Sequence, residues 1–463
     1  MPILAGFMVP HPPMIVPAVG RGSEKQVEKT TRAYEQAAEE IAALRPDTII
    51  ITSPHATMYA DYFHISPGRS ARGDFGQFRA GQESYRVDYD AELTSLISKL
   101  AREKGFPAGV MGERDRKLDH GTMVPLYFIR KAYPEMCKIV RIGLSGLPLT
   151  EHYRLGQMIR EAVDILGRRA VFVASGDLSH KLQSYGPYGF AAEGPQYDER
   201  IMDVCSRAAF GELFDFEESF CEKAAECGHR SFVIMAGAFD GLSVKAAQLS
   251  HEDVTGVGYG ICTFYPGEPD EGRHFLAQYL VKASEKLSAA RAQEDPYVQL
   301  ARKTVEMYVR DRVKPEVPAG LPPEMLSTRA GAFVSIHEHG KLRGCIGTIA
   351  PVRSCVAQEI IDNAVSASTR DPRFDPITAD ELEWLEISVD VLGEAEPIAS
   401  PAELDVKRYG VIVTKGTKRG LLLPDLDGVD TVEQQIAIAK SKAGIADWDK
   451  KVQLERFEVV RHH

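Results

Sequence analysis

The stretch TIIITSPHA, residues 48–56, carries the clearest fold signal of the chain. Its first five residues are β-branched and predict a strand, which ends where Pro54 and His55 begin a turn. A second apolar run, Ile3–Val9, is followed in the same way by His11 within VPHPP. Both histidines thus lie at the C-terminal end of a predicted strand, the edge where open α/β sheets bind their ligands. Flanking prolines restrict the backbone there and suit side chains that must keep one direction.

Around these two runs, strand-like and helix-like segments alternate through residues 1–265. This order predicts an α/β domain with a central mixed sheet flanked by helices. The expected helices are 24–44, 91–104 and 151–166, and the expected strands are 3–9, 48–52, 138–144, 170–174 and 255–265.

The amino-acid composition changes after this block. GEPDEGR, residues 267–273, is polar and turn-rich, and the helical stretch 275–291 is rich in Ala, Lys and Glu. We therefore expect a first domain at 1–266, a linker at 267–294 and a smaller α+β domain at 295–463. The second domain is expected to contain helices at 296–313, 353–368 and 432–443, and strands at 332–337, 386–392, 411–414 and 420–424.

Composition excludes several classes of protein. The formal net charge of −11 over 463 residues argues against a nucleic-acid polymer as the main partner. Seven widely spaced cysteines without a CxxC pair suggest neither a disulfide framework nor a zinc ribbon. No apolar stretch approaches the ~20 residues of a membrane span. The expectation is a cytoplasmic protein that does not use a membrane, with an oligomer left open.

Two further histidines lie in short polar segments. His120 stands in LDHG, and His180 ends SGDLSH after the predicted strand 170–174. One histidine at a strand end is more often a hydrogen-bonded loop residue than a ligand. Four such positions favour a shared cleft.

The acidic or soft ligand that would complete a metal site is expected in AECGHR, residues 225–230. Imidazole ligands with one carboxylate and open positions are typical of non-haem iron. Glu226 would complete such a facial triad. Cys227, as a thiolate, would give a softer site for copper or zinc, or would be a buried thiol at the start of the following helix.

Together, HPP, SPHA, DHG, SGDLSH and ECGHRSF resemble the class III extradiol dioxygenases, the LigB-like superfamily, over about residues 1–265. The ECG segment is more similar to the Memo branch. The resemblance implies a dioxygenase or related oxygenase that uses Fe(II) and O₂ on a small aromatic substrate.

Site residues follow from the resemblance position by position. His11 and His55 would be the first two iron ligands, and the third would be Glu226 or Cys227. His180 would match the acid/base histidine and His120 a histidine near the O₂ position. Asp177 would orient His180, or simply cap its turn. Tyr185, Tyr188 and Tyr197 would line an aromatic pocket or pack in the core.

The second domain has its densest signal in KLRGCIGT, residues 341–348. Arg343, Cys345 and His337 form a candidate site there, because arginine beside a cysteine favours the thiolate. A glycine-bounded hairpin with a buried cysteine is the alternative. His337 and His339 belong to HEHG, residues 337–340, which is expected to form a polar turn; on a strand, the two histidines would face one side.

LRGCIGT, with the downstream segments around DPRF and EISVDVL, resembles the AMMECR1 family over about residues 295–460. A Memo-like domain joined to an AMMECR1-like domain is similar to the AmmeMemoRadiSam group, which implies a radical-SAM protein as a separate partner. Three functions stay open: an Fe(II) oxygenase, a metal-binding scaffold without turnover, and a hydrolase that uses Cys345.

Overall fold

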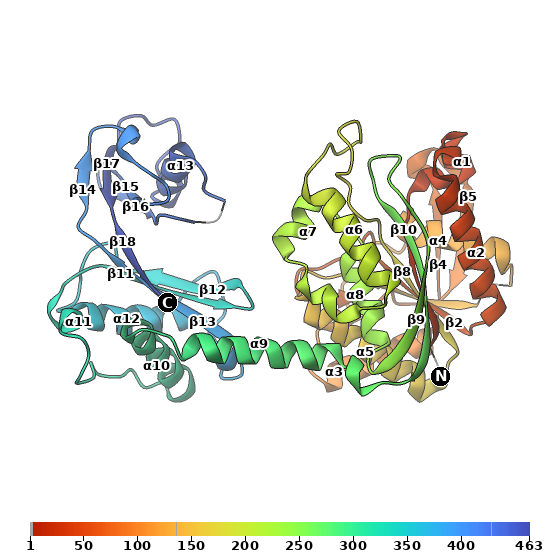
Figure 1. Ribbon diagram of the computed structural model, residues 1–463, viewed down its shortest axis with the longest axis horizontal. Helices are drawn as coiled ribbons and strands as arrows, with labels where there is room; N and C mark the ends of the chain where they lie inside the picture. Colours follow the sequence, from red (N-terminus) through yellow and green to blue (C-terminus); the bar gives the residue numbers. More distant parts are fainter. Residues whose placement is uncertain (1–2, 136, 427) are drawn as a thin grey trace. The chain divides into compact units, whose positions relative to one another are not determined.

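The computed structural model describes residues 3–135, 137–426 and 428–463, and the chain divides into two compact units, residues 1–280 and 281–463. The boundary falls within helix α9, Phe275–Arg291 (Figure 1). This helix occupies the Ala-, Lys- and Glu-rich part of the stretch that was expected to link the domains. Among the described residues, no helix is both long and apolar enough to cross a bilayer.

The N-terminal unit is built on a six-stranded mixed sheet in the order β7-β2-β8-β1-β10-β9. Neighbours from β7 to β1 run parallel, whereas β10 and β9 run antiparallel at one edge. The predicted α/β architecture with a mixed sheet is confirmed. The strands are β1 Ile3–Val9, β2 Thr48–Ser53, β7 Lys138–Gly143, β8 Ala170–Ser175, β9 Leu242–Glu252 and β10 Tyr259–Pro269.

Helices cover both faces of this sheet, which explains why β2 is apolar along its length. Ile49 and Ile51 pack with α2 and α4, whereas Ile50 packs on the other face with α3, α5, α6 and α8. The covering helices are α2 Glu28–Leu44, α3 Ala91–Glu103, α4 His120–Ala132, α5 Leu149–Leu166, α6 Glu193–Ser206 and α8 His229–Ala238.

Shorter elements fill the connections of the unit. The most important for the site is the β4–β5 hairpin, whose turn contains the 3₁₀ helix η3. These elements are η1 Pro13–Ile15, α1 Pro17–Gly20, η2 Ser23–Val27, β3 Phe63–His64, β4 Ser70–Phe75, η3 Gly76–Phe78, β5 Ala80–Asp88, β6 Ala108–Gly109, η4 Phe210–Asp215, α7 Glu218–Ala224 and η5 Glu271–Arg273.

The C-terminal unit contains two four-stranded antiparallel sheets, ordered β12-β11-β13-β18 and β14-β17-β15-β16. Helices α10 and α12 pack on the first sheet and α13 on the second, so the α+β prediction is confirmed. The elements are α10 Pro296–Asp311, α11 Pro323–Ser327, β11 Ala332–Glu338, β12 Lys341–Gly347, α12 Val356–Thr369, η6 Leu382–Trp384, β13 Leu385–Leu392, β14 Glu396–Ile398, η7 Pro401–Glu403, β15 Gly410–Lys415, β16 Lys418–Leu422, α13 Val432–Lys442, β17 Gln453–Phe457 and β18 Val459–His462.

The loops that carry the candidate site residues lie at one edge of the N-terminal sheet. Strands β1, β2 and β8 are parallel, so their C-terminal ends meet at this edge. The loops that follow them carry His11, His55 and His180. Helix α4 begins at His120 with Asp119 as its N-cap. The topology thus brings four separate sequence motifs to one place.

Candidate metal centre

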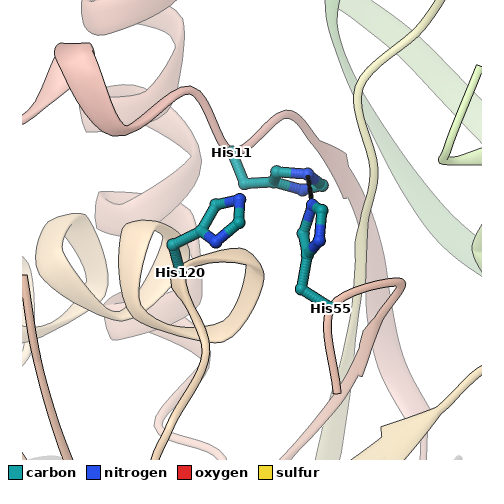
Figure 2. A group of neighbouring side chains, drawn as sticks. All are labelled: His11, His55 and His120. Atoms are coloured by element: carbon teal, nitrogen blue, oxygen red, sulfur yellow. Dashed lines mark hydrogen bonds between the residues drawn. The ribbon is translucent and has the colours of Figure 1, made fainter. Parts of the chain in front are cut away.

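Three histidines form the centre of this edge: His11, His55 and His120 (Figure 2). One ring nitrogen from each lies within 4.8 Å of those of the other two. The Nε2 atoms of His11 and His55 are 3.0 Å apart, and the rings of His55 and His120 have centroids 4.0 Å apart. His11 is buried, His120 is half-buried and His55 is exposed, so the cluster is open to solvent on one side.

Ser175, at the end of β8, determines the tautomer of His11. Its hydroxyl donates to the carbonyl of Gly121 at 2.6 Å, so its oxygen accepts from Nδ1 of His11 at 3.0 Å. Nδ1 therefore carries the hydrogen, and Nε2 presents its lone pair to the cluster. A metal-ligating histidine has this arrangement, with the remote ring nitrogen hydrogen-bonded to the protein.

The separations within the cluster fit a single transition-metal ion. Two imidazole nitrogens that each lie about 2.1 Å from a metal are about 3.0–3.4 Å apart at angles of 90–109°. The 3.0 Å between Nε2 of His11 and Nε2 of His55 agrees with this range. The Sγ atom of Cys227 is 3.6 Å from Nε2 of His11, and a thiolate about 2.3 Å from a tetrahedral metal would give about the same value.

Of the two residues expected to supply the third ligand, Cys227 is the one beside the histidines. The carboxylate of Glu226 instead accepts the backbone N–H of His229 at 2.6 Å and so caps the start of α8. Gly176 and Gly228 pack so closely that a Cβ on Gly176 would lie 2.1 Å from Cα of Gly228. This contact brings the Cys227 segment against the end of β8.

His120 offers a second way to complete the ligand set. It was expected near the O₂ position, and the structure places its ring beside both His11 and His55. Burial, followed by the charges of His55 and His11, lowers the pKa of His120 to about 3. Burial, followed by His55, also lowers the pKa of His11 well below its usual value. These imidazoles are therefore neutral at pH 7, as metal ligands must be.

A buried ion pair supports the loop that carries His55. Asp119 accepts from Ser53 Oγ at 2.5 Å and from the backbone N–H of Thr122 at 3.0 Å. Nε of Arg141 lies 3.4 Å from its other oxygen. Burial alone would raise the pKa of Asp119, but Arg141 and these hydrogen bonds lower it, so the carboxylate stays ionised. Ser53 Oγ also accepts the backbone N–H of His55 at 3.2 Å.

His180 lies on the loop after β8, and its Nδ1 donates to the carbonyl of Ala225. A carbonyl can only accept, so Nε2 is the unprotonated nitrogen of the neutral ring and is available as a base. Asp177 was expected to orient this imidazole. Its Oδ1 accepts the backbone N–H of His11 at 2.7 Å, and the Ala225 carbonyl holds His180.

Asp177 and Cys227 are adjacent groups that both become negatively charged when they ionise, so the charge of Asp177 disfavours ionisation of Cys227. The backbone N–H of Asp177 donates to Sγ of Cys227 at 3.3 Å. Burial raises the pKa of Asp177 to about 6 and, with the nearby carboxylates, raises the pKa of Cys227 well above its usual range. A bound cation acts in the opposite direction and favours both anionic forms.

Aromatic residues near the site divide into two groups. Tyr188 packs edge-on to His180, and Tyr185 is exposed on the same loop. Tyr197 is buried against Phe216 and belongs to the core, which is the packing role considered from sequence. Phe78 packs edge-on to His120 and was missed, because the polar hairpin that carries it gives no strong strand signal.

The candidate site of the C-terminal unit lies on the β11–β12 hairpin. Arg343 donates to both carboxylate oxygens of Glu381, at 2.6 and 3.2 Å. Sγ of Cys345 accepts from Ser335 Oγ at 3.2 Å, and its backbone N–H donates to Asp371 at 2.9 Å. Among the described residues, Arg343 thus pairs with Glu381, whereas Cys345 bonds to Ser335 and Asp371.

His337 lies on β11, opposite Glu386 of β13, and burial lowers its pKa. The polar turn expected at residues 337–340 begins after β11, so His337 and His339 do not share one face of a strand. Strand β11 ends at Glu338, and His339 has φ +51° in the turn that it forms with Gly340.

Comparison with known proteins matches both units to sequence families. Residues 5–262 match the family described as the catalytic LigB subunit of aromatic ring-opening dioxygenase. Residues 298–462 match the AMMECR1 family.

Individual relatives match either the whole chain or a part of it. Protein CA_C1420 of Clostridium acetobutylicum is 42% identical over 98% of both chains. A protein of Thermotoga maritima is 52% identical over 36% of this chain and 98% of its own length. The 2-aminophenol 1,6-dioxygenase beta subunit of a Pseudomonas species is 29% identical over 56% of this chain and 92% of its own.

Proposed function

The chain belongs to the family of the catalytic LigB subunit of aromatic ring-opening dioxygenase and carries an AMMECR1 domain, and on this premise we propose that its N-terminal unit is a metal-dependent extradiol-type dioxygenase or related oxygenase. The proposed substrate is a small aromatic molecule with adjacent hydroxyl or amino groups, used together with O₂. The observation that carries the proposal is the 3.0 Å approach of the Nε2 atoms of His11 and His55 at an open sheet edge.

His11 and His55 would hold the metal, with Cys227 or His120 as the further protein donor. Fe(II) is the proposed ion, because two histidines and open positions are part of the donor set with which non-haem iron binds substrate and O₂, although Cys227 or His120 would stand here in place of its usual carboxylate. When bound, it would supply a Lewis acid for the substrate oxygens and electrons for O₂. Zinc and copper are alternatives that a thiolate donor would favour.

The protein's own groups perform the proton chemistry in this proposal. His180 accepts a proton from a substrate hydroxyl at Nε2, while Nδ1 keeps its hydrogen bond to the Ala225 carbonyl. Asp177 holds the backbone at His11 and stabilises the imidazolium that forms at His180. The exposed face of the cluster at His55 admits the substrate.

Anaerobic reconstitution with Fe(II), followed by O₂ uptake with catechols and 2-aminophenol, tests the proposal. Wild-type protein should retain about one iron per chain and consume O₂ with at least one of these compounds. His11→Ala and His55→Ala should each lose the iron, whereas His274→Ala, at a half-exposed histidine paired with Asp240, should keep it. Wild-type protein that binds iron yet consumes no O₂ with any of them would contradict oxygenase activity.

The position of Cys227 favours a second candidate function. A thiolate near His11 suits a metal-binding scaffold without oxygenase turnover, which would work with a separate radical-SAM partner. In either case the AMMECR1 unit is proposed as the module that presents a substrate or partner surface. Tight zinc or copper binding without O₂ consumption would be the result expected of the scaffold.

A further inference from the structure

Two aromatic side chains contact the histidines without belonging to the metal centre. The rings of Phe78 and His120 have centroids 5.5 Å apart and planes at 82°. The rings of Tyr188 and His180 have centroids 5.1 Å apart and planes at 87°. Both are edge-to-face pairs, a favourable geometry for aromatic rings.

The two aromatic rings are held by different anchors. Phe78 ends η3 and packs against Phe75, which is buried in the core. Tyr188 lies in the loop after His180, whose ends are tied by a bridge between Leu182 and Phe190. Phe78 also packs, partly buried, against the core on one face of the central sheet, whereas Tyr188 is mostly exposed.

The Tyr188 loop exposes an unusual amount of aromatic surface. Tyr185 is 72% exposed, Tyr188 is 61% exposed and Phe190 is 58% exposed. Large exposed apolar side chains that gather at a chemical site mark a surface that buries a ligand. Tyr188 is the member of this group that also contacts a histidine of the site.

We infer that Phe78 and Tyr188 are specificity-determining residues, which select a flat aromatic ring at the metal centre over a non-aromatic chelator. This inference rests on the proposed function, because it supposes that a chelating substrate occupies the site. A bound aromatic ring gains contacts with one or both side chains beyond those it makes through its chelating oxygens. A small non-aromatic chelator, such as acetohydroxamate, binds through its oxygens and gains little from either side chain.

Anaerobic binding titrations of the Fe(II)-loaded protein test the inference without turnover. The probes are 4-nitrocatechol, followed by its absorbance, and acetohydroxamate, followed by its competition with 4-nitrocatechol. Phe78→Leu and Tyr188→Leu should each weaken 4-nitrocatechol binding by about three- to tenfold, the range expected for one lost aromatic contact. Acetohydroxamate binding should change by less than about twofold, since edge-to-face pairing requires an aromatic ring.

Controls separate selection from general damage to the site. Tyr133→Leu removes a partly buried ring at the C-terminal end of α4, the end opposite His120, and should leave both affinities unchanged. Phe78→Tyr and Tyr188→Phe keep a ring and should retain wild-type affinity. Metal content, measured on every variant, should equal that of the wild type.

Three outcomes would overturn the inference. Equal 4-nitrocatechol affinity in wild type and both leucine variants would refute the role of the rings and leave the proposed function intact. Equal weakening of both probes would show an effect on the metal centre instead of on ring selection. Failure of Fe(II)-loaded wild-type protein to bind 4-nitrocatechol would remove the proposed function and this inference together.

Discussion

The hydroxyl oxygen of Ser175 lies 3.0 Å from Nδ1 of His11 and sends its own hydrogen to the Gly121 carbonyl. One serine thus fixes the ring nitrogen that faces the cluster. We expect Ser175→Ala to weaken metal binding by about 10- to 100-fold, as for other partners of metal-bound histidines. Chelator competition measures the change. Ser250→Ala, at a buried serine of β9, is the matched control, and equal affinity in the two variants would contradict the role of Ser175.

Cys227 and Glu226 are neighbours with different surroundings, so separate variants distinguish their roles. Cys227→Ser should lower the metal content, because Sγ lies 3.6 Å from Nε2 of His11. Glu226→Gln should keep the metal, since its side chain caps α8 and an amide oxygen can still accept from His229. His120→Ala shows whether a histidine is the third donor instead. Metal analysis after anaerobic purification decides, and loss of metal in Glu226→Gln alone would reverse the assignment.

Removing one partner of the buried pair between Arg141 and Asp119 should destabilise the fold, because it leaves a buried charge without its counter-ion. Arg141→Met leaves Asp119 ionised without its cation, and we expect the free energy of unfolding to fall by about 3–5 kcal/mol. Urea denaturation measures this loss. The double variant Arg141→Met with Asp119→Asn removes both charges and should recover part of it. A double variant that is less stable than Arg141→Met would show that the pair is not the cause.

Sequence predicts the parts of the site that depend on the central sheet. The run Ile49–Ile51 identifies β2 because helices bury both faces of that strand, and its end then places His55. The β4–β5 hairpin could not be foreseen in the same way. Its strand SARGDF, residues 70–75, alternates buried small or aromatic residues with exposed polar ones and contains no apolar run. Phe78, which the hairpin carries, was therefore missed.

The choice between Glu226 and Cys227 was also beyond local sequence. On an irregular segment, the directions of two adjacent side chains depend on the local backbone conformation. Here a tertiary contact determines that conformation. Gly176 and Gly228, 52 positions apart in the chain, pack directly on one another. The sequence shows both glycines but not that they are in contact. It therefore cannot decide whether Glu226 or Cys227 is the third ligand.

His152 makes stability depend on pH. Burial lowers its pKa to about 3, whereas a histidine of the unfolded chain titrates near 6.5. Between pH 7 and pH 5 the unfolded state therefore gains a proton that the folded state does not take up. The folded state should lose about 2 kcal/mol over this interval through His152 alone.

The test of this linkage is the variant His152→Gln in metal-free protein. The difference between its free energies of unfolding at pH 7 and pH 5, from urea denaturation, should be about 2 kcal/mol smaller than in the wild type. His463→Gln changes an exposed histidine and should keep the wild-type difference. An unchanged difference in His152→Gln would mean that His152 takes up its proton in the folded state.

His180 should govern turnover without governing metal or substrate binding. Its Nδ1 is engaged by the Ala225 carbonyl, so only Nε2 can accept a substrate proton. Glutamine at this position can donate to the same carbonyl but cannot act as a base near neutral pH. We expect His180→Gln to lower kcat for O₂ uptake by about 10²–10⁴, the usual contribution of a general base, with iron content unchanged. Because binding precedes proton transfer, anaerobic affinity for 4-nitrocatechol should stay within about twofold of the wild type. A fall in that affinity equal to the fall in kcat/KM would place His180 in substrate binding and remove it as the base.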